Sequence, residues 1–288
     1  MVDKPSSWTS HDVVNKMRRL SGIQKIGHLG TLDPMATGVL PLMIGRATRL
    51  AQFFQRTDKI YEATVRFGFC TDTYDAEGVA VSGEVDVRLD RDQLESMLPS
   101  FTGVLSQVPP AVSAKKIAGV PAYKLARQNI PVEMKPVEVE VMALDLNRCE
   151  GNCADLTVHC STGTYVRSIA HDLGQMLGCG AHLAALRRTA SGGFLISQAK
   201  TMEELAEIAA SGKLNEAVVP AAELIPEFPS EPVDAGTAAF IRQGRDFQVS
   251  PFRRRGDAKY VKAVTYEGDL VAIGEARLPN LYHPVLVF

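Results

Sequence analysis

The chain has 288 residues, of which 45% are hydrophobic and 22% are charged, and its formal net charge is −2. These values fit a soluble globular protein with one large domain and room for a small second one. No apolar run reaches the length of a membrane span, and the first 20 residues contain six charged side chains. The sequence thus argues against a signal peptide and a membrane anchor, and we expect a cytoplasmic protein.

The five cysteines are an odd number without regular spacing, which argues against a disulfide framework. Cys149, Cys153, His159 and Cys160 raise the alternative of a metal site. Their spacing does not match the usual zinc patterns, and neighbouring residues of a strand point to opposite faces. We therefore expect reduced thiols and no bound metal.

Charge is distributed unevenly along the chain. Residues 16–59 contain eight basic and two acidic side chains, whereas residues 200–232 contain two lysines and seven glutamates. Each segment can simply be a solvated surface. Together they also fit a protein with a single side that binds a polyanion.

The N-terminal third predicts a helix, a loop, a strand and a second helix. Thr9 and Ser10 are candidate caps for the first helix, whose apolar residues follow at helical spacing up to Gly22. Residues 27–34 form a glycine-punctuated loop, and residues 39–44 read as an apolar strand. A short helix is expected over residues 46–55.

The middle of the chain begins with a strand at residues 61–69, in which apolar residues alternate with polar ones. The acidic run 71–78 is its turn, and a helix is expected over residues 90–98. Residues 107–129 contain Pro, Gly and several cationic side chains, and they look like an excursion from the fold.

Two strands are predicted at residues 137–146 and 154–160, followed by a helix that Thr164 caps and Gly178 ends. Thr201 and Glu204 have the spacing of a capping box for another helix. Four prolines from Pro220 to Pro232 mark a linker before about 55 residues with strand-like runs. Strands and helices do not alternate strictly, so the fold class is α+β.

The densest motif is "GHLGTLDPMATGVLPLMIGRATRL", which starts at Gly27 and brings His28, Thr31 and Asp33 into one loop. From the residues alone, Asp33 before Pro34 is an ordinary helix cap or turn. His28 alone carries little information.

This motif resembles the catalytic segment of TruB-type pseudouridine synthases. Three further segments resemble motifs of the same family in the same order: "DKPSSWTSHDVV", "QVPPAVSAKKIAGVPAYKLAR", and "STGTYVRSIAHDLG" with "GCGAHLAALRR". Ser7 and Val112 depart from the family pattern, which usually has Gly and an aromatic residue there.

The resemblance implies site residues. Asp33 matches the family's catalytic aspartate, Arg167 the arginine that pairs with it, and Tyr61 the tyrosine on which the target base stacks. An arginine partner should lower the pKa of Asp33. Tyr61 is also a candidate base for the final proton removal. Further substrate-binding positions are implied at His28, Tyr165, Leu186, Lys4, Lys115 and Lys116.

The resemblance also implies a fold and an activity. We expect a mixed, largely antiparallel central sheet with flanking helices in a catalytic domain at residues 1–225, with an RNA-contacting insertion at about 107–135. A small β-rich, PUA-like RNA-binding domain is expected at residues 233–288. The expected reaction turns uridine-55 of the tRNA T loop into pseudouridine after base flipping, without a cofactor, in a monomer that needs no protein partner.

Several alternatives stay open at this point. Asp33 can attack ribose C1′ directly or remove the C2′ proton through a glycal route. A guide-RNA-dependent, dyskerin-like synthase subunit shares the Asp33 motif and works with partner proteins. A non-catalytic protein that binds and folds tRNA is the third interpretation.

Overall fold

The computed structural model describes residues 1–113, 116–117, 119–122, 134–250 and 258–288. The chain divides into two compact units. Unit 1 contains residues 1–22, 26–43 and 52–206, and unit 2 contains residues 23–25, 44–51 and 207–288. Among the described residues, no helix has the length and apolar character needed to cross a bilayer.

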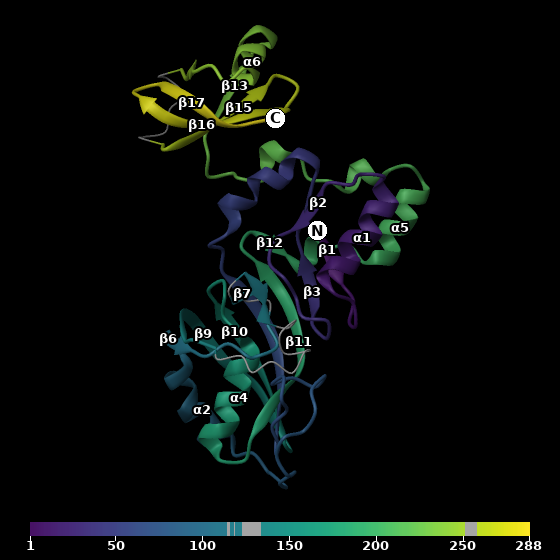
Figure 1. The fold of residues 1–288 in the computed structure, drawn as a ribbon, viewed down its shortest axis with the longest axis vertical. Helices are drawn as coiled ribbons and strands as arrows, with labels where there is room; N and C mark the ends of the chain where they lie inside the picture. Colours follow the sequence, from purple (N-terminus) through teal and green to yellow (C-terminus); the bar gives the residue numbers. More distant parts are fainter. Residues whose placement is uncertain (114–115, 118, 123–133, 251–257) are drawn as a thin grey trace. The chain divides into compact units, whose positions relative to one another are not determined.

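Unit 1 is built on an eight-stranded mixed sheet, in which β11 is a long inner strand (Figure 1). Its strands are, in spatial order, β1 (Val2–Lys4), β3 (Thr37–Leu40), β11 (Ala181–Ser191), β5 (Lys59–Phe67), β10 (Cys153–Cys160), β9 (Val137–Glu150) and β6 (Gly103–Gln107), with β12 (Phe194–Leu195) beside β11. Among the described strand pairs of this sheet, only β3 with β11 is parallel. The predicted α+β fold with a largely antiparallel sheet is confirmed.

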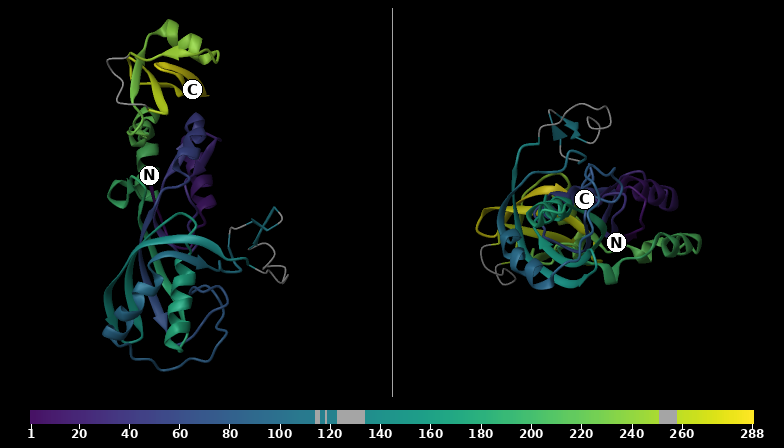
Figure 2. Two further views of the ribbon diagram at one scale, coloured as in Figure 1. Left: turned by 90° about the vertical axis from the view of Figure 1, so that its left-hand side faces the viewer. Right: turned by 90° about the horizontal axis from the view of Figure 1, so that it is seen from below.

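The alternating pattern of β5 determines which face of the sheet is covered. Tyr61, Ala63, Val65 and Phe67 are all buried, whereas Glu62 is exposed. Helix α4 (Val166–Leu177) packs against β11 and contacts β5 (Figure 2). The apolar stripe of this helix and the apolar face of the strand therefore form one core.

The predicted helix ends of unit 1 are mostly confirmed. Thr9 caps α1 (Ser10–Ser21) in a capping box with Asp12, and Gly22 ends it with a φ of 71°. Asp90 caps α2 (Arg91–Met97), and Thr201 and Glu204 form the predicted reciprocal bonds at the start of α5 (Met202–Ala210). The helix α4 begins one residue later than predicted, because Tyr165 rather than Thr164 is its N-cap. Gln107 accepts the Tyr165 N–H at 2.8 Å and so fixes this start.

Two other predictions need correction. The strand expected at residues 39–44 is split at Pro41, and its second half, β4 (Leu42–Ile44), pairs with β2 (Ile26–His28). The helix expected at 46–55 is a 3₁₀ helix, η1 (Gly45–Phe54). Further 3₁₀ turns are η2 (Leu98–Phe101), η3 (Ile196–Gln198), η4 (Leu214–Ala217) and η5 (Ala221–Glu223).

The described part of the predicted insertion contains a two-stranded ribbon of β7 (Lys116–Ile117) and β8 (Val120–Pro121). Residues 114–115, 118 and 123–133 lie outside the described residues.

The C-terminal part of unit 2 is β-rich, as predicted. Its five-stranded sheet has, in spatial order, β13 (Ser230–Val233), β15 (Tyr260–Thr265), β16 (Leu270–Leu278), β17 (Leu281–Val287) and β14 (Phe247–Gln248). Helix α6 (Ala235–Arg242) packs on this sheet over a core that includes Ile241 and Tyr282. Pro232, expected in a linker, lies in the edge strand β13, a position where the missing N–H is tolerated.

Gly174 sets the distance between α4 and β11, and it supports a stability prediction. A Cβ atom there would lie 2.1 Å from the Ala181 nitrogen, inside van der Waals contact. In a helix interior, alanine is more favourable than glycine by about 1 kcal/mol. The clash at Gly174 is with backbone atoms, which cannot move aside easily, so it outweighs this gain. We therefore expect Gly174→Ala to lower the free energy of unfolding by about 1–3 kcal/mol. Urea unfolding followed by circular dichroism measures it. Gly193→Ala, with open space around the added atom, is the control and should change little; a Gly174→Ala protein as stable as the parent would contradict the packing argument.

Candidate active site

The loop that carries Asp33 is held by hydrogen bonds from the Lys4 side chain to backbone carbonyls. Lys4 is fully buried, and its Nζ donates to the carbonyls of Pro5 (2.9 Å), Trp8 (2.6 Å) and Pro34 (3.1 Å). Burial lowers the pKa of Lys4 to about 8. The three N–H groups of this ammonium are therefore all used inside the protein, directly beside Asp33.

A second anchor holds the same loop from α1. The Ser10 hydroxyl donates to the Leu32 carbonyl at 3.2 Å and accepts the Leu32 N–H at 2.9 Å. Gly30, two residues earlier, has a φ of 80°, a conformation that favours glycine. The loop that precedes Asp33 is thus fixed on both sides.

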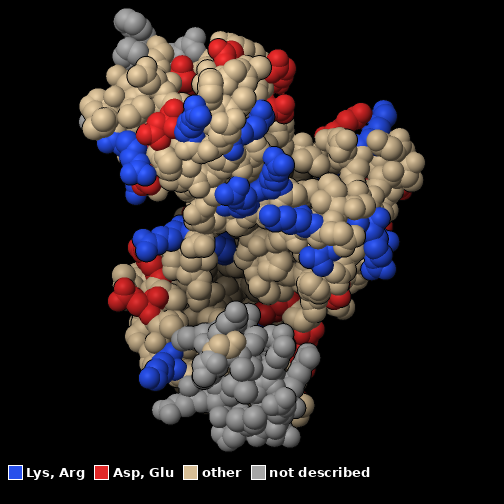
Figure 3. Space-filling view, turned by 45° about the horizontal axis from the view of Figure 1, so that its top comes forward, with Lys and Arg blue, Asp and Glu red and all other residues tan. Residues whose placement is uncertain are grey.

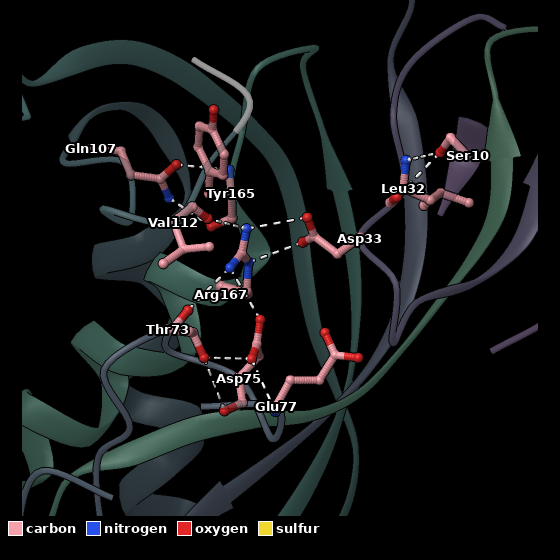
Figure 4. A network of polar contacts seen from close by, with 10 residues as sticks. All are labelled: Ser10, Leu32, Asp33, Thr73, Asp75, Glu77, Gln107, Val112, Tyr165 and Arg167. Atoms are coloured by element: carbon pink, nitrogen blue, oxygen red, sulfur yellow. Dashed lines mark hydrogen bonds and ion pairs between the residues drawn. The ribbon is translucent and has the colours of Figure 1, made fainter. Parts of the chain in front are cut away.

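Arg167 lies between two carboxylates (Figure 4). Its Nε is 3.0 Å from Asp33 Oδ2, its Nη2 donates to Asp33 Oδ1 at 3.2 Å, and its Nη1 donates to Asp75 Oδ2 at 3.1 Å. Arg167 also donates to the carbonyls of Thr73 and Val112, and only 4% of the residue is exposed. This two-pronged contact requires the planar guanidinium group.

Asp75 was missed when the sequence alone was interpreted, because the run 71–78 was read only as a turn. The carboxylate is 3% exposed and accepts from the Thr73 hydroxyl at 2.6 Å and the Glu77 N–H at 3.1 Å. Leu183 of β11 donates to the Tyr74 carbonyl, which ties the turn to the sheet. A cluster of acidic residues directly after a buried strand was the available signal.

The electrostatic prediction for Asp33 is wrong in sign. Burial raises the pKa of Asp33, and this effect exceeds the lowering by the Arg167 charge; the negative charge of Asp75 raises it further. Arg167 is shared between two carboxylates, so it neutralises neither of them completely. The carboxylate of Asp33 is therefore a stronger proton acceptor than a solvated aspartate.

A pocket of about 210 Å³ opens beside Asp33. It is bounded by the Asp33 loop, by Lys59 and Tyr61 of β5, by the start of α4 and by Leu186 of β11. The structure thus brings five of the predicted residues together: Asp33, Tyr61, Tyr165, Arg167 and Leu186. Burial raises the pKa of Tyr61 to about 12, so its phenol is protonated at neutral pH.

The other predicted site residues lie elsewhere or are not described. His28 is in β2 and is not among the residues that line the pocket. Its Nδ1 is buried without a partner in the described part of the chain, and burial lowers the pKa of His28. Lys115 is outside the described residues, and the structure describes only the backbone of Lys116, in β7.

A larger hollow, of about 790 Å³, lies where Glu62 and Thr64 point. It shares Leu186 with the pocket, but Asp33, Tyr61 and Arg167 do not line it. Among the described residues, no group of three His, Cys, Asp or Glu side chains is arranged to hold a metal ion. His159, considered above as a metal ligand, is instead 2.5 Å from Asp58.

The pocket has the carboxylate of Asp33 on one side and the aromatic residue Tyr61 beside it. Comparison with known proteins identifies the family of the chain. Residues 18–166 match the model of the TruB family pseudouridylate synthase N-terminal domain, and residues 167–225 match that of the tRNA pseudouridylate synthase B C-terminal domain.

Curated relatives and solved structures agree with these models. A tRNA pseudouridine synthase B of Solibacter usitatus is 61% identical over 100% of this chain and 98% of its own, and one of Thermobifida fusca is 42% identical over 100% and 97%. The chain is also similar to a structure described as a Cbf5-Nop10-Gar1 complex, with a TM-score of 0.68 and 27% identity over 97% of this chain and 78% of the other. The chain therefore belongs to the TruB family of pseudouridylate synthases.

Proposed function

We propose that this protein isomerises uridine-55 in the T loop of tRNA to pseudouridine, and that it acts alone in the cytoplasm as a monomer. The observation that carries the proposal is the Asp33–Arg167 ion pair at the edge of a pocket that also contains Tyr61. The reaction breaks the N1–C1′ bond of uridine, turns the ring in the pocket and joins C5 to C1′. It is an isomerisation, so it needs no external energy source and no cofactor.

Asp33 supplies the carboxylate that acts on the ribose, either at C1′ or at the C2′ proton. Its raised pKa makes it a better proton acceptor, which serves the route that removes the C2′ proton. Tyr61 provides the aromatic face for the base, and its raised pKa argues against an ionised phenolate as the final base. Tyr165 and Leu186 line the remaining walls.

Access to the target base requires that the nucleotide leave its stack, which costs about a few kcal/mol. Contacts to RNA phosphates must hold the stem during this step. On the face drawn in Figure 3, Lys and Arg side chains are spread among uncharged residues, together with smaller groups of Asp and Glu. We assign phosphate contacts to the exposed basic side chains of segment 16–59, which exclude the buried Lys59, and to Lys115 and Lys116 of the insertion at about 107–135.

We further propose that residues 1–225 form the catalytic domain and that residues 233–288 form a PUA-like RNA-binding domain. Lys4 supports the Asp33 loop in this scheme, since its bonds to three carbonyls leave no N–H for RNA. His28 ends β2, two residues before Gly30 of the pocket, and we assign it a contact to the RNA around the flipped nucleotide.

The dyskerin-like alternative is the second candidate. The similarity to the Cbf5-Nop10-Gar1 complex supports a common fold, but the identity is 27%, against 61% for the tRNA pseudouridine synthase B of Solibacter usitatus. Incubation of the purified chain with an unmodified T-arm stem-loop, followed by pseudouridine mapping, separates the two. Activity without guide RNA or partner proteins supports the stand-alone enzyme.

The first prediction concerns Asp33→Asn. We expect no detectable pseudouridine and tRNA binding within about tenfold of the parent, because one carboxylate supplies chemistry and many phosphate contacts supply affinity. Single-turnover assays and filter binding measure the two. The exposed Asp86→Asn is the matched control and should keep the parent rate. Substantial turnover by Asp33→Asn would remove Asp33 from the mechanism.

The second prediction uses the two neighbours of Asp33. Activity needs ionised Asp33, so the rate should rise with pH through the pKa of Asp33 and then level off. Arg167→Ala should move this rise to higher pH, and Asp75→Asn should move it to lower pH, because the charge of Asp75 raises the pKa of Asp33. Single-turnover rates against pH test both shifts. If both variants keep the pH profile of the parent rate, neither Arg167 nor Asp75 determines the pKa of Asp33.

The third prediction is a stability change in Arg167→Ala and Arg167→Lys. Removal of Arg167 leaves Asp75 buried without its ion-pair partner, which typically costs about 3–5 kcal/mol. Arg167→Lys should recover only part, because an ammonium cannot contact both carboxylates in the same way. Urea unfolding of the parent and both variants measures the difference. Equal stability of Arg167→Ala and the parent would contradict the buried pair.

A further inference from the structure

Lys59 is a buried cation in the pocket to which the mechanism above assigns no role. The residue is 7% exposed, and its Nζ donates to the Thr57 carbonyl at 2.8 Å and to the Thr162 hydroxyl at 3.1 Å. It lines the pocket together with Asp33 and Tyr61. An ammonium has three N–H groups, so one remains for a ligand in the pocket.

A second buried cation lies next to it. Arg188 is fully buried; its Nε donates to the Val39 carbonyl at 2.8 Å and its Nη2 to the Gly30 carbonyl at 3.2 Å. Its guanidinium also interacts with the Tyr61 side chain. A Cβ atom at Gly30 would lie 3.3 Å from both Arg188 Nη1 and Lys59 Cε, so the two cations meet at the same glycine of the Asp33 loop.

The two positive charges are poorly compensated inside the protein. Within the described chain, neither Lys59 nor Arg188 forms an ion pair with a carboxylate. The charge of Asp58 raises the pKa of Lys59, but this carboxylate forms its hydrogen bond with His159 and not with Lys59. Burial of like charges without a counter-ion costs stability, so an anion that arrives with the substrate is the expected partner.

The depth of the pair indicates which anion this is. Arg188 is the direct cross-strand neighbour of Tyr61 in the pairing of β11 with β5. Tyr61 is itself 7% exposed, so the cations lie at the level of the stacked base and not at the surface, where phosphates lie. The negative charge at that level is the one that develops on uracil during the reaction.

We propose that Lys59 is a catalytic residue that hydrogen-bonds the uracil ring as it leaves C1′, with Arg188 as a second positive charge beside Tyr61. The proposal rests on the proposed pseudouridine synthase activity. The N1–C1′ bond breaks with both electrons on uracil, and the negative charge spreads over N1, O2 and O4. Both cations keep their protons while C5 bonds to C1′. Solvent water then takes the C5 proton and returns a proton to N1, so the N–H of the product replaces the C–H that is lost. Fixed donors at a developing charge are among the strongest catalytic devices.

The test compares Lys59→Met, Lys59→Arg and the exposed control Lys213→Met in the full-length protein. The substrates are two T-arm RNAs, one with uridine and one with 5-fluorouridine at the target position. Fluorine withdraws electrons, so the fluorinated base needs less help to leave. Single-turnover loss of the parent nucleoside is the readout, because fluorine at C5 prevents the final proton loss. Unfolding midpoints are measured in parallel, and Lys59→Gln replaces Lys59→Met if the latter does not fold.

On uridine RNA we expect Lys59→Met to react about 100-fold more slowly than the parent, Lys59→Arg to recover part of the rate and Lys213→Met to match the parent. On fluorouridine RNA the defect of Lys59→Met should shrink at least about tenfold, with affinity for RNA close to that of the parent.

Equal defects on both RNAs would overturn the proposal. The proposal would also be overturned if Lys59→Met kept the parent rate but bound RNA more weakly, with a slope of log affinity against log salt concentration that is smaller by about one. That result is the signature of a lost phosphate contact. A parent chain that makes no pseudouridine refutes the proposed function itself. If the parent chain makes pseudouridine and Lys59→Met reacts at the parent rate, only the role of Lys59 is refuted.

Discussion

The shared guanidinium of Arg167 is the interaction on which the site depends. It joins Asp33 from the loop after β2, Asp75 from the turn after β5, and the carbonyl of Val112. These segments are distant in sequence, and each is held at a second point, Asp33 through the bonds of Lys4 to Pro34 and Asp75 through the bond of Leu183 to Tyr74. The geometry of the pocket thus follows from one side chain with five N–H donors and very little exposure.

Sharing has an electrostatic consequence. A guanidinium devoted to one carboxylate would lower its pKa, whereas here burial and the charge of Asp75 outweigh that effect at Asp33. The pocket is lined by a carboxylate with increased proton affinity and by the cation Lys59, and the buried Arg188 lies beside Tyr61 in the neighbouring strand. Such separation of charge within a small volume suits a reaction in which the sugar and the base develop opposite charges.

Local patterns in the sequence predicted what depends on local physics. The alternation at Tyr61 to Phe67 identified β5 and its buried face, and the capping residues Thr9 and Thr201 marked helix starts. The catalytic candidates came from family motifs, because Asp33 before Pro34 is by itself an ordinary turn. The role of Asp75, the helix start at Tyr165 and the sign of the pKa shift at Asp33 depend on contacts between distant segments, which no local pattern reports.

The separation of Asp33 from Arg167 also has a consequence during synthesis. The two residues are 134 positions apart, and β3, just after the Asp33 loop, pairs in parallel with β11, the last long strand of the sheet. The ribosome delivers the chain from its N-terminus, and contacts of such high sequence separation form late in folding. A nascent chain that ends before α4 therefore has the carboxylate but neither its guanidinium partner nor a closed pocket. The complete site arises only when the central sheet is complete, so partly made chains lack the means to modify RNA.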